Sequence, residues 1–157
     1  MYIERKLIGY NHSSRLGNTI KYIVIHDTGN PNKTANALNH WRYFGGANRN
    51  ASAHYFVDDH SIIQIVDDNN AAWHVGDGGG RFGISNQNSI GVELCIDQGS
   101  NRAIAKKHLL MLVHHLMLVY NIDKSHVVRH YVASRKICPR SMSTNNWQEW
   151  REFWNSI

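Results

Sequence analysis

Residues 22–30 have the sequence YIVIHDTGN, in which an apolar, largely β-branched run leads into His26 and then into Asp-Thr-Gly. Such a run favours a buried strand, and the three residues after the histidine are typical of a turn. A second apolar run, SIGVELCI at residues 89–96, carries Glu93 as its one charged residue. We expect this run to form another buried strand, so the sequence predicts a sheet with polar side chains at two positions.

The remaining pattern predicts a single α/β domain, with a central mixed β-sheet flanked by helices. The clearest helix is expected at residues 103–120, with Asn121 at its end. Its apolar stripe at helical spacing is formed by Ala105, Leu109, Leu112, Leu116 and Val119. The other expected elements are a helix at 32–46 capped by Thr34, a hairpin at 53–66, an irregular loop at 67–88, a strand at 126–130, and a helix at 145–154 that presents Trp147, Trp150 and Trp154.

Composition places the chain among globular proteins. Of 157 residues, 42% are hydrophobic and 18% charged, and no apolar run is long enough to cross a bilayer. The first ten residues, MYIERKLIGY, lack the apolar core of a secretory signal, so we expect synthesis in the cytoplasm without a signal peptide. The formal net charge of +5 favours anionic polymers, including nucleic acid, acidic lipid and cell-wall polymers. The basic residues are scattered and match no nucleic-acid-binding motif, so we expect neither nucleic acid nor membrane as a partner.

Eleven histidines are many for this length and suggest a metal site. His26 and His130 each stand where an expected strand ends, and Cys138 follows His130 by eight residues. Two imidazoles and one thiolate are donors that zinc favours, and they would leave one position for water. No HExxH or paired CxxC is present, so the residues alone leave open that both histidines are ordinary hydrogen-bonded side chains. Cys95 lies in an apolar run and is expected to be a small buried hydrophobe.

Glu93 and Lys136 are candidates for chemistry beside such a site. A carboxylate in an apolar strand is costly unless it is paired or faces a cleft, although an outward-facing position would also accommodate it. If Glu93 faces a cleft, it could act as a general base or acid. Lys136, two residues before Cys138, could stabilise a developing oxyanion, or could be a surface lysine.

Five motifs together resemble one known family. YIVIHDTG, AHYFVDD, AAWHVGDG, NSIGVELC and RHYVASRKICP occur in the order seen in zinc-dependent N-acetylmuramoyl-L-alanine amidases of the type-2 amidase family. That family includes phage endolysin catalytic domains and is related to the peptidoglycan recognition proteins. The resemblance covers residues 20–140, and it implies the α/β fold of those proteins.

The resemblance implies one zinc ion held by His26, His130 and Cys138, with Glu93 near the metal and Lys136 supporting the transition state. The implied reaction is hydrolysis of the amide bond between the N-acetylmuramoyl lactyl group and L-alanine in bacterial peptidoglycan. Further residues in or beside the matched motifs are expected to contact the substrate, namely Asp27, Thr28, His54, Tyr55, Trp73 and His74.

The chain departs from the family pattern at two positions. Many relatives have an aromatic residue, often tyrosine, where this chain has Ala53, and its place near the metal could pass to Tyr55 one pleat further along. Many relatives also have aspartate where this chain has Val132. The Gly-rich segment around residues 75–83 does not match a phosphate-binding loop, and we expect it to form a rim over the substrate groove.

We expect residues 1–157 to form one catalytic domain without a separate wall-binding domain, to be monomeric, and to act on the bacterial cell wall as a phage or prophage endolysin. Two alternatives remain at this point. A non-catalytic peptidoglycan-binding module would have the same fold but would typically lack the cysteine ligand. A cytoplasmic wall-recycling amidase would share the chemistry and also lack a signal peptide.

Overall fold

Strand β3 (Tyr22–Asp27) lies inside a six-stranded sheet in the computed structural model, which describes residues 1–157. The strand order is β1-β5-β4-β7-β3-β8. β3 pairs in parallel with its two neighbours, and β4 pairs in parallel with β7 and antiparallel with β5. The mixed sheet predicted from the sequence is therefore confirmed. The other strands of this sheet are β1 (Glu4–Arg5), β4 (Tyr55–Val57), β5 (Ile62–Gln64), β7 (Ser89–Leu94) and β8 (Val127–Arg129).

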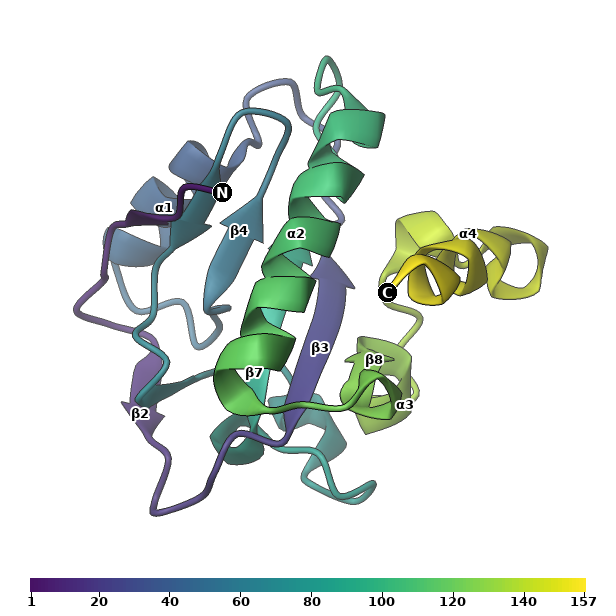
Figure 1. Cartoon of the computed structure of the whole chain (residues 1–157). Helices are drawn as coiled ribbons and strands as arrows, with labels where there is room; N and C mark the ends of the chain where they lie inside the picture. The colour runs from purple at the N-terminus through teal and green to yellow at the C-terminus, as the bar shows by residue number, and fades with distance from the viewer.

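One face of the sheet is covered by helix α2 (Arg102–Tyr120), which passes in front of β7 in Figure 1, with β4 on one side of it and β3 on the other. Alternate strand residues such as Ile23 and Ile25 pack against it in the largest hydrophobic cluster. The predicted apolar stripe is confirmed at four of its five positions. The fifth, Val119, is 55% exposed. The buried face of the helix includes Val113 and continues from Leu116 to Tyr120, four residues on, so Val119 lies outside it.

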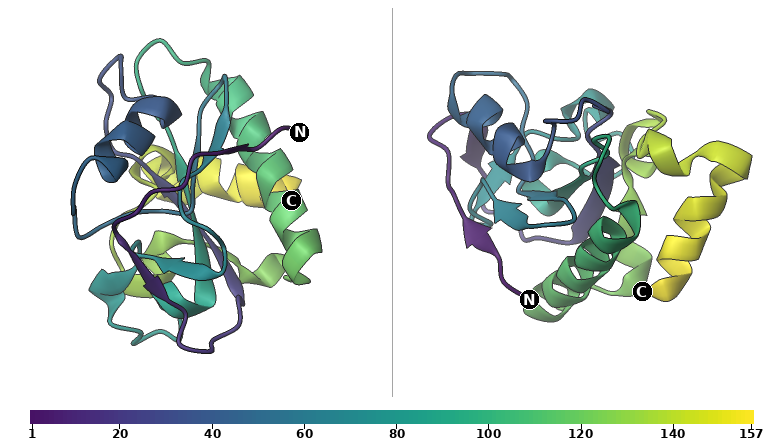
Figure 2. Two further views of the ribbon diagram at one scale, coloured as in Figure 1. Left: turned by 90° about the vertical axis from the view of Figure 1, so that its left-hand side faces the viewer. Right: turned by 90° about the horizontal axis from the view of Figure 1, so that it is seen from above.

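The opposite face of the sheet is covered in two separate parts. Helix α1 (Ala37–Gly45) packs over β4 and β5, on the other side of the sheet from α2 (Figure 2). The short helix α3 (His130–Ser134) and the loop around Val75 pack over β3 and β8. Between these two covers lie the carboxyl ends of β3 and β7, where His26 is the register partner of Glu93. The two polar residues of the apolar strands are thus neighbours on one face.

The helix starts and several short elements differ from the sequence prediction. Helix α1 is capped by Asn36, which accepts a hydrogen bond from the Asn39 N–H, and not by Thr34. The strand expected at 126–130 ends at Arg129, and His130 is the first residue of the short helix α3. Residues 67–88 also contain regular structure, namely β6 (Asn70–Ala72) and the 3₁₀ turns η1 (Gly76–Gly78) and η2 (Asn86–Asn88).

The remaining elements complete the outer surface. β2 (His12–Ser14) pairs antiparallel with β6 in a two-stranded sheet, and η3 (Lys124–His126) precedes β8. After η4 (Arg140–Met142), helix α4 (Thr144–Ser156) lies beside the β8 edge (Figure 1) and buries Trp150, with Trp147 and Trp154 half-buried. No helix combines the length and the apolar character needed to cross a membrane.

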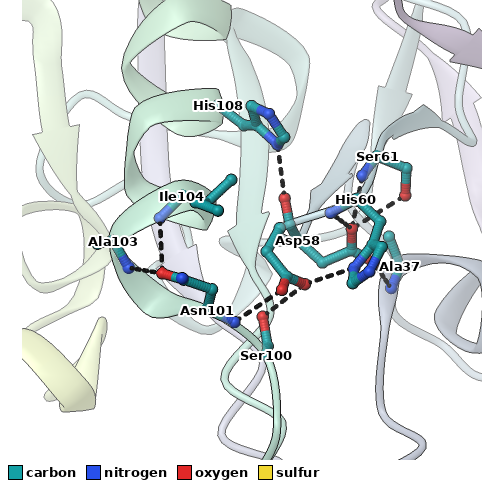
Figure 3. A network of polar contacts seen from close by, with 10 residues as sticks. Ala37, Asp58, His60, Ser61, Ser100, Asn101, Ala103, Ile104 and His108 are labelled. Atoms are coloured by element: carbon teal, nitrogen blue, oxygen red, sulfur yellow. Dashed lines mark hydrogen bonds and ion pairs between the residues drawn. The ribbon is translucent and has the colours of Figure 1, made fainter.

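Asp58, in the turn between β4 and β5, connects three elements (Figure 3). Its Oδ2 accepts a hydrogen bond from the Ala37 N–H at the start of α1, and its Oδ1 accepts from the N–H groups of His60 and Ser61. Its backbone carbonyl is 2.9 Å from Nδ1 of His108 on α2. Because the Asp58 side chain and Ala37 are both buried, water cannot replace the carboxylate as the acceptor of the Ala37 N–H.

Replacement of Asp58 by alanine is therefore expected to lower the free energy of unfolding by roughly 2–4 kcal/mol, because it leaves a buried helix N–H and two turn N–H groups without acceptors. Urea denaturation measures the change. Asp123→Ala is the matched control, since Asp123 also accepts from a turn N–H but is exposed, and it should cost less. Equal losses in the two variants would contradict the role given to Asp58.

Candidate metal centre

His26, His130 and Cys138 meet at the carboxyl end of β3. All three side chains are buried, and their possible ligand atoms lie within 4.8 Å of one another. Nδ1 of His26 is 3.7 Å from Sγ of Cys138, and the centroids of the two imidazole rings are 4.5 Å apart. The three residues that the sequence singled out as metal ligands are thus brought together, across more than one hundred positions of chain.

Backbone contacts hold the cysteine in this position. The Tyr131 N–H of α3 donates to the Cys138 carbonyl, and the Ser141 N–H donates to Oδ2 of Asp27, the last residue of β3. Asp27 was expected to contact substrate. In the structure its buried carboxylate binds the segment after Cys138 to the strand that carries His26.

Both imidazoles turn the same nitrogen toward the centre. Nε2 of His130 lies 2.9 Å from Oδ1 of Asp77, while its Nδ1 is buried and has no hydrogen-bond partner. Nε2 of His26 lies 3.0 Å from Nδ1 of His74, which leaves Nδ1 of His26 facing Cys138. An orphaned buried nitrogen is costly unless something binds it. Two Nδ1 atoms and one sulfur therefore form a set of donors directed at one point.

The protonation states of the two histidines and the cysteine favour binding of a metal cation. Burial, with the neighbouring His130 and Lys136 adding to it, lowers the pKa of His26 well below its usual value, and burial also lowers that of His130. Both rings are therefore neutral with a lone pair available. Burial, followed by the Glu93 charge, raises the pKa of the Cys138 thiol to about 12. A thiolate is stable in such a place only beside a cation, and a neutral-imidazole and thiolate set is the kind that zinc prefers.

Glu93 lies at the edge of this centre. Its Oε1 is 3.9 Å from Nδ1 of His26, and its Oε2 is buried without a partner, so it does not point outward to solvent. Burial raises its pKa to about 8, the Asp27 charge contributes in the same direction, and Lys136 opposes both. A carboxyl group with a pKa near neutrality can both accept and return a proton.

Two cavities border the centre. One of about 410 Å³ is lined by Thr28, Tyr43, Phe56 and Glu93 among others, and Oγ1 of Thr28 is buried there without a partner. The other, of about 400 Å³, has Trp73, His74, His130 and the exposed Lys136 in its lining. A substrate bound beside the centre would occupy these cavities. Three of the expected substrate-contacting residues line them, namely Thr28, Trp73 and His74, together with Lys136.

Two expected substrate contacts lie elsewhere. Tyr55 packs on the α2 side of the sheet and donates its hydroxyl proton to Asp68, so the expectation that it faces the metal site beside Ala53 is wrong. The chain bends at His54, whose carbonyl accepts from two consecutive N–H groups, and this breaks the alternation of side chains. His54 is fully buried with its Nδ1 accepting from the Gly91 N–H, and lines neither cavity. Val132 packs beside Val24.

Asp77 is the residue at the centre that sequence reasoning missed. It stands in the Gly-rich segment that was interpreted only as a rim. Gly78 lets this segment approach α3 closely, since a Cβ at that position would lie 2.3 Å from the Ala133 carbonyl oxygen. This approach brings Asp77 to His130, 53 positions away in the sequence.

Residues 58–60 form a second group with possible ligand atoms close together. Its carboxylate oxygens already have partners. Both oxygens of Asp58 accept from the backbone, and those of Asp59 accept from Ser100 and Asn101. This group is explained as a hydrogen-bonded turn and is not a competing metal centre.

The fold and the donor set together define a class of protein. In these α/β domains, two imidazoles at the ends of adjacent parallel strands and one thiol from a following segment lie beside a half-buried glutamate. The chain belongs to the N-acetylmuramoyl-L-alanine amidase family Amidase_2, whose model matches residues 16–141. The family resemblance and the fold expected from it are thereby confirmed.

Individual relatives agree with this membership. N-acetylmuramoyl-L-alanine amidase XlyA of Bacillus subtilis is 36% identical over 135 residues, which cover 86% of this chain and 44% of XlyA. The solved catalytic domain of XlyA superposes with a TM-score of 0.88 at 33% identity, covering 100% of this chain and 99% of that one. A mutant endolysin from B. subtilis gives a TM-score of 0.88 at 34% identity, with coverage of 100% and 99%. The chain spans about half the length of the curated relatives it matches.

Proposed function

We propose that this chain is a zinc-dependent N-acetylmuramoyl-L-alanine amidase that hydrolyses the amide bond between the muramoyl lactyl group and L-alanine in bacterial peptidoglycan. The observation that carries the proposal is the convergence of two bare Nδ1 atoms and one sulfur beside Glu93. Family membership supplies the substrate class. Zinc bound by His26, His130 and Cys138 would polarise a carbonyl and lower the pKa of a water molecule.

The chain's own residues perform the proton transfers. The Glu93 carboxylate accepts a proton from the attacking water and returns it to the leaving amine of L-alanine, as general base and then general acid. The ammonium group of Lys136, which lines the same cavity as His130, stabilises negative charge as it develops on the carbonyl oxygen. Asp77 and His74 hold the two imidazoles in place, and Asp27 holds the segment after Cys138.

An enzyme is favoured over a binding module by the complete donor set. A module that only binds wall fragments needs neither a sulfur donor nor a buried carboxyl group with a pKa near 8. We further propose that residues 1–157 form a monomeric catalytic domain that acts on the cell wall. The match along the whole catalytic domain of XlyA supports this extent, and the likeness to an endolysin of B. subtilis favours a phage-type lysin over a recycling enzyme.

Mass spectrometry of purified peptidoglycan after digestion tests the proposal. We expect new stem peptides with a free L-alanine amino group and glycan strands with free lactyl carboxylates. A zinc chelator should abolish both products, and added zinc should restore them. Peptidoglycan that stays uncut while the protein sediments with it would instead establish a recognition module. Cleavage at a sugar linkage or within the stem peptide would contradict the assigned bond.

A further inference from the structure

A chain of hydrogen-bonding side chains extends from His26 away from the metal centre. Nε2 of His26 lies 3.0 Å from Nδ1 of His74, with the two rings meeting edge to face at 81°. Nε2 of His74 lies 3.1 Å from Oγ of Ser89. That hydroxyl in turn lies 2.6 Å from the backbone carbonyl oxygen of Ser85. The chain thus ends on a group that can only accept a hydrogen bond.

Because the Ser85 carbonyl can only accept, it determines which atom donates in each hydrogen bond of this chain. The one proton of the Ser89 hydroxyl is donated to the Ser85 carbonyl, so its oxygen must accept from His74. His74 therefore carries its proton on Nε2 and presents a lone pair at Nδ1. This lone pair accepts the Nε2 proton of His26. Nδ1 of His26, the atom that faces Cys138, is then left without a proton.

The position of the His74 ring is also fixed by close packing. It lies directly over Gly91 of β7, where a Cβ would stand 2.5 Å from Cγ of His74. The backbone N–H groups of His74 and Val75 both donate to Oδ1 of Asn86. Ser89 is fully buried. Ring and hydroxyl are thus held in fixed positions behind the metal ligand.

We propose that His74 and Ser89 are positioning residues that fix the tautomer of His26, keeping its proton on Nε2 so that Nδ1 is available to the metal. This inference rests on the proposed function, because the metal gives the tautomer its purpose. The sequence suggested only that His74 lines the substrate groove. Because Nδ1 of His74 accepts the hydrogen bond from His26, we infer that the main role of His74 is to orient this ligand.

The first test is made on the metal-free protein by two-bond ¹H–¹⁵N correlation spectroscopy of the histidine rings. We expect His26 and His74 to be in the Nε2–H form in the wild type. In His74→Phe, which keeps a ring but removes the acceptor, the Nδ1–H form of His26 should become populated. An unchanged Nε2–H form in a folded variant would overturn the proposal. If His74→Phe does not fold, Ser89→Ala, which releases the proton of His74, should shift the same signals.

The second test measures zinc affinity by competition with a chromophoric chelator. We expect His74→Phe to weaken zinc binding by about 10–100-fold, as removal of a metal ligand's hydrogen-bond partner does. His74→Asn, whose amide oxygen stands near the place of Nδ1, should recover most of that loss. His108→Phe is the matched control, because His108 lies on α2, which covers the opposite face of the sheet, and its Nδ1 contacts the Asp58 carbonyl. The zinc affinity of this variant should not change.

The outcomes separate this proposal from the proposed function. Zinc binding by the wild type with unchanged affinity in a folded His74→Phe would overturn only the role of His74. A wild type that binds no zinc would overturn the proposed function, whatever tautomer His26 adopts. A loss in His74→Phe that His74→Asn does not recover would identify a packing role and also overturn the positioning role.

Discussion

Glu93→Gln is expected to lower kcat for amide cleavage by about 10²–10⁴-fold, the range that a general acid–base group contributes. The amide keeps the size of the side chain but can neither accept the proton of the attacking water nor return it to the leaving amine. The folded state should not suffer, because the substitution removes a carboxyl group that burial disfavours when charged. Cleavage of a soluble muramoyl peptide gives the rate, and elemental analysis gives the zinc content.

The matched control is Glu149→Gln, the same chemical change at a carboxylate that binds Arg102 and Lys106 between α2 and α4. It should leave kcat unchanged. Zinc content should stay at one ion per chain in both variants. A folded, zinc-loaded Glu93→Gln protein with the kcat of the wild type would contradict the proton-transfer role of Glu93.

Cys138→Ser is expected to weaken zinc binding by at least about 100-fold and to reduce amide cleavage in proportion to the zinc lost. Loss of an outer partner of a ligand already costs about 10–100-fold, and Cys138 is proposed as a ligand itself. A serine hydroxyl in the same buried place neither ionises near neutral pH nor offers a polarisable sulfur. Chelator competition measures the affinity.

Cys95→Ser is the control for this substitution, because Cys95 is also a buried cysteine but lies beside His40 and is not among the three proposed zinc ligands. It should retain the zinc affinity of the wild type while losing some stability. A Cys138→Ser protein that holds zinc as tightly as the wild type would show that the sulfur is not a ligand.

The main features of the fold could be predicted from the sequence, because they follow from local patterns. The β-branched run before His26 and the lone charge of Glu93 indicate two buried strands, and parallel pairing then places the two polar residues side by side. The apolar periodicity of residues 103–120 likewise predicts a helix with one side packed against the sheet. Val119 was misplaced because the stripe drifts at the helix end, where Tyr120 takes over the packing.

The supporting residues of the centre could not be predicted in this way, because they depend on contacts between distant segments. His74 reaches His26 over 48 positions, and Asp77 reaches His130 over 53. Neither pairing leaves a local pattern. Tyr55 was misassigned for a related reason, since strand alternation was assumed to pass unbroken through His54. Two-residue and three-residue strands such as β1 are too short to have a period at all.

A crystal structure of the zinc-loaded protein, with diffraction data collected on both sides of the zinc absorption edge, tests whether His26, His130 and Cys138 bind the metal. We expect a single zinc peak bonded to Nδ1 of His26, Nδ1 of His130 and Sγ of Cys138. Zinc–nitrogen distances of about 2.0–2.1 Å and a zinc–sulfur distance of about 2.3 Å are expected, with the fourth position open toward Glu93. A zinc peak elsewhere, or bonds through either Nε2, would contradict this expectation.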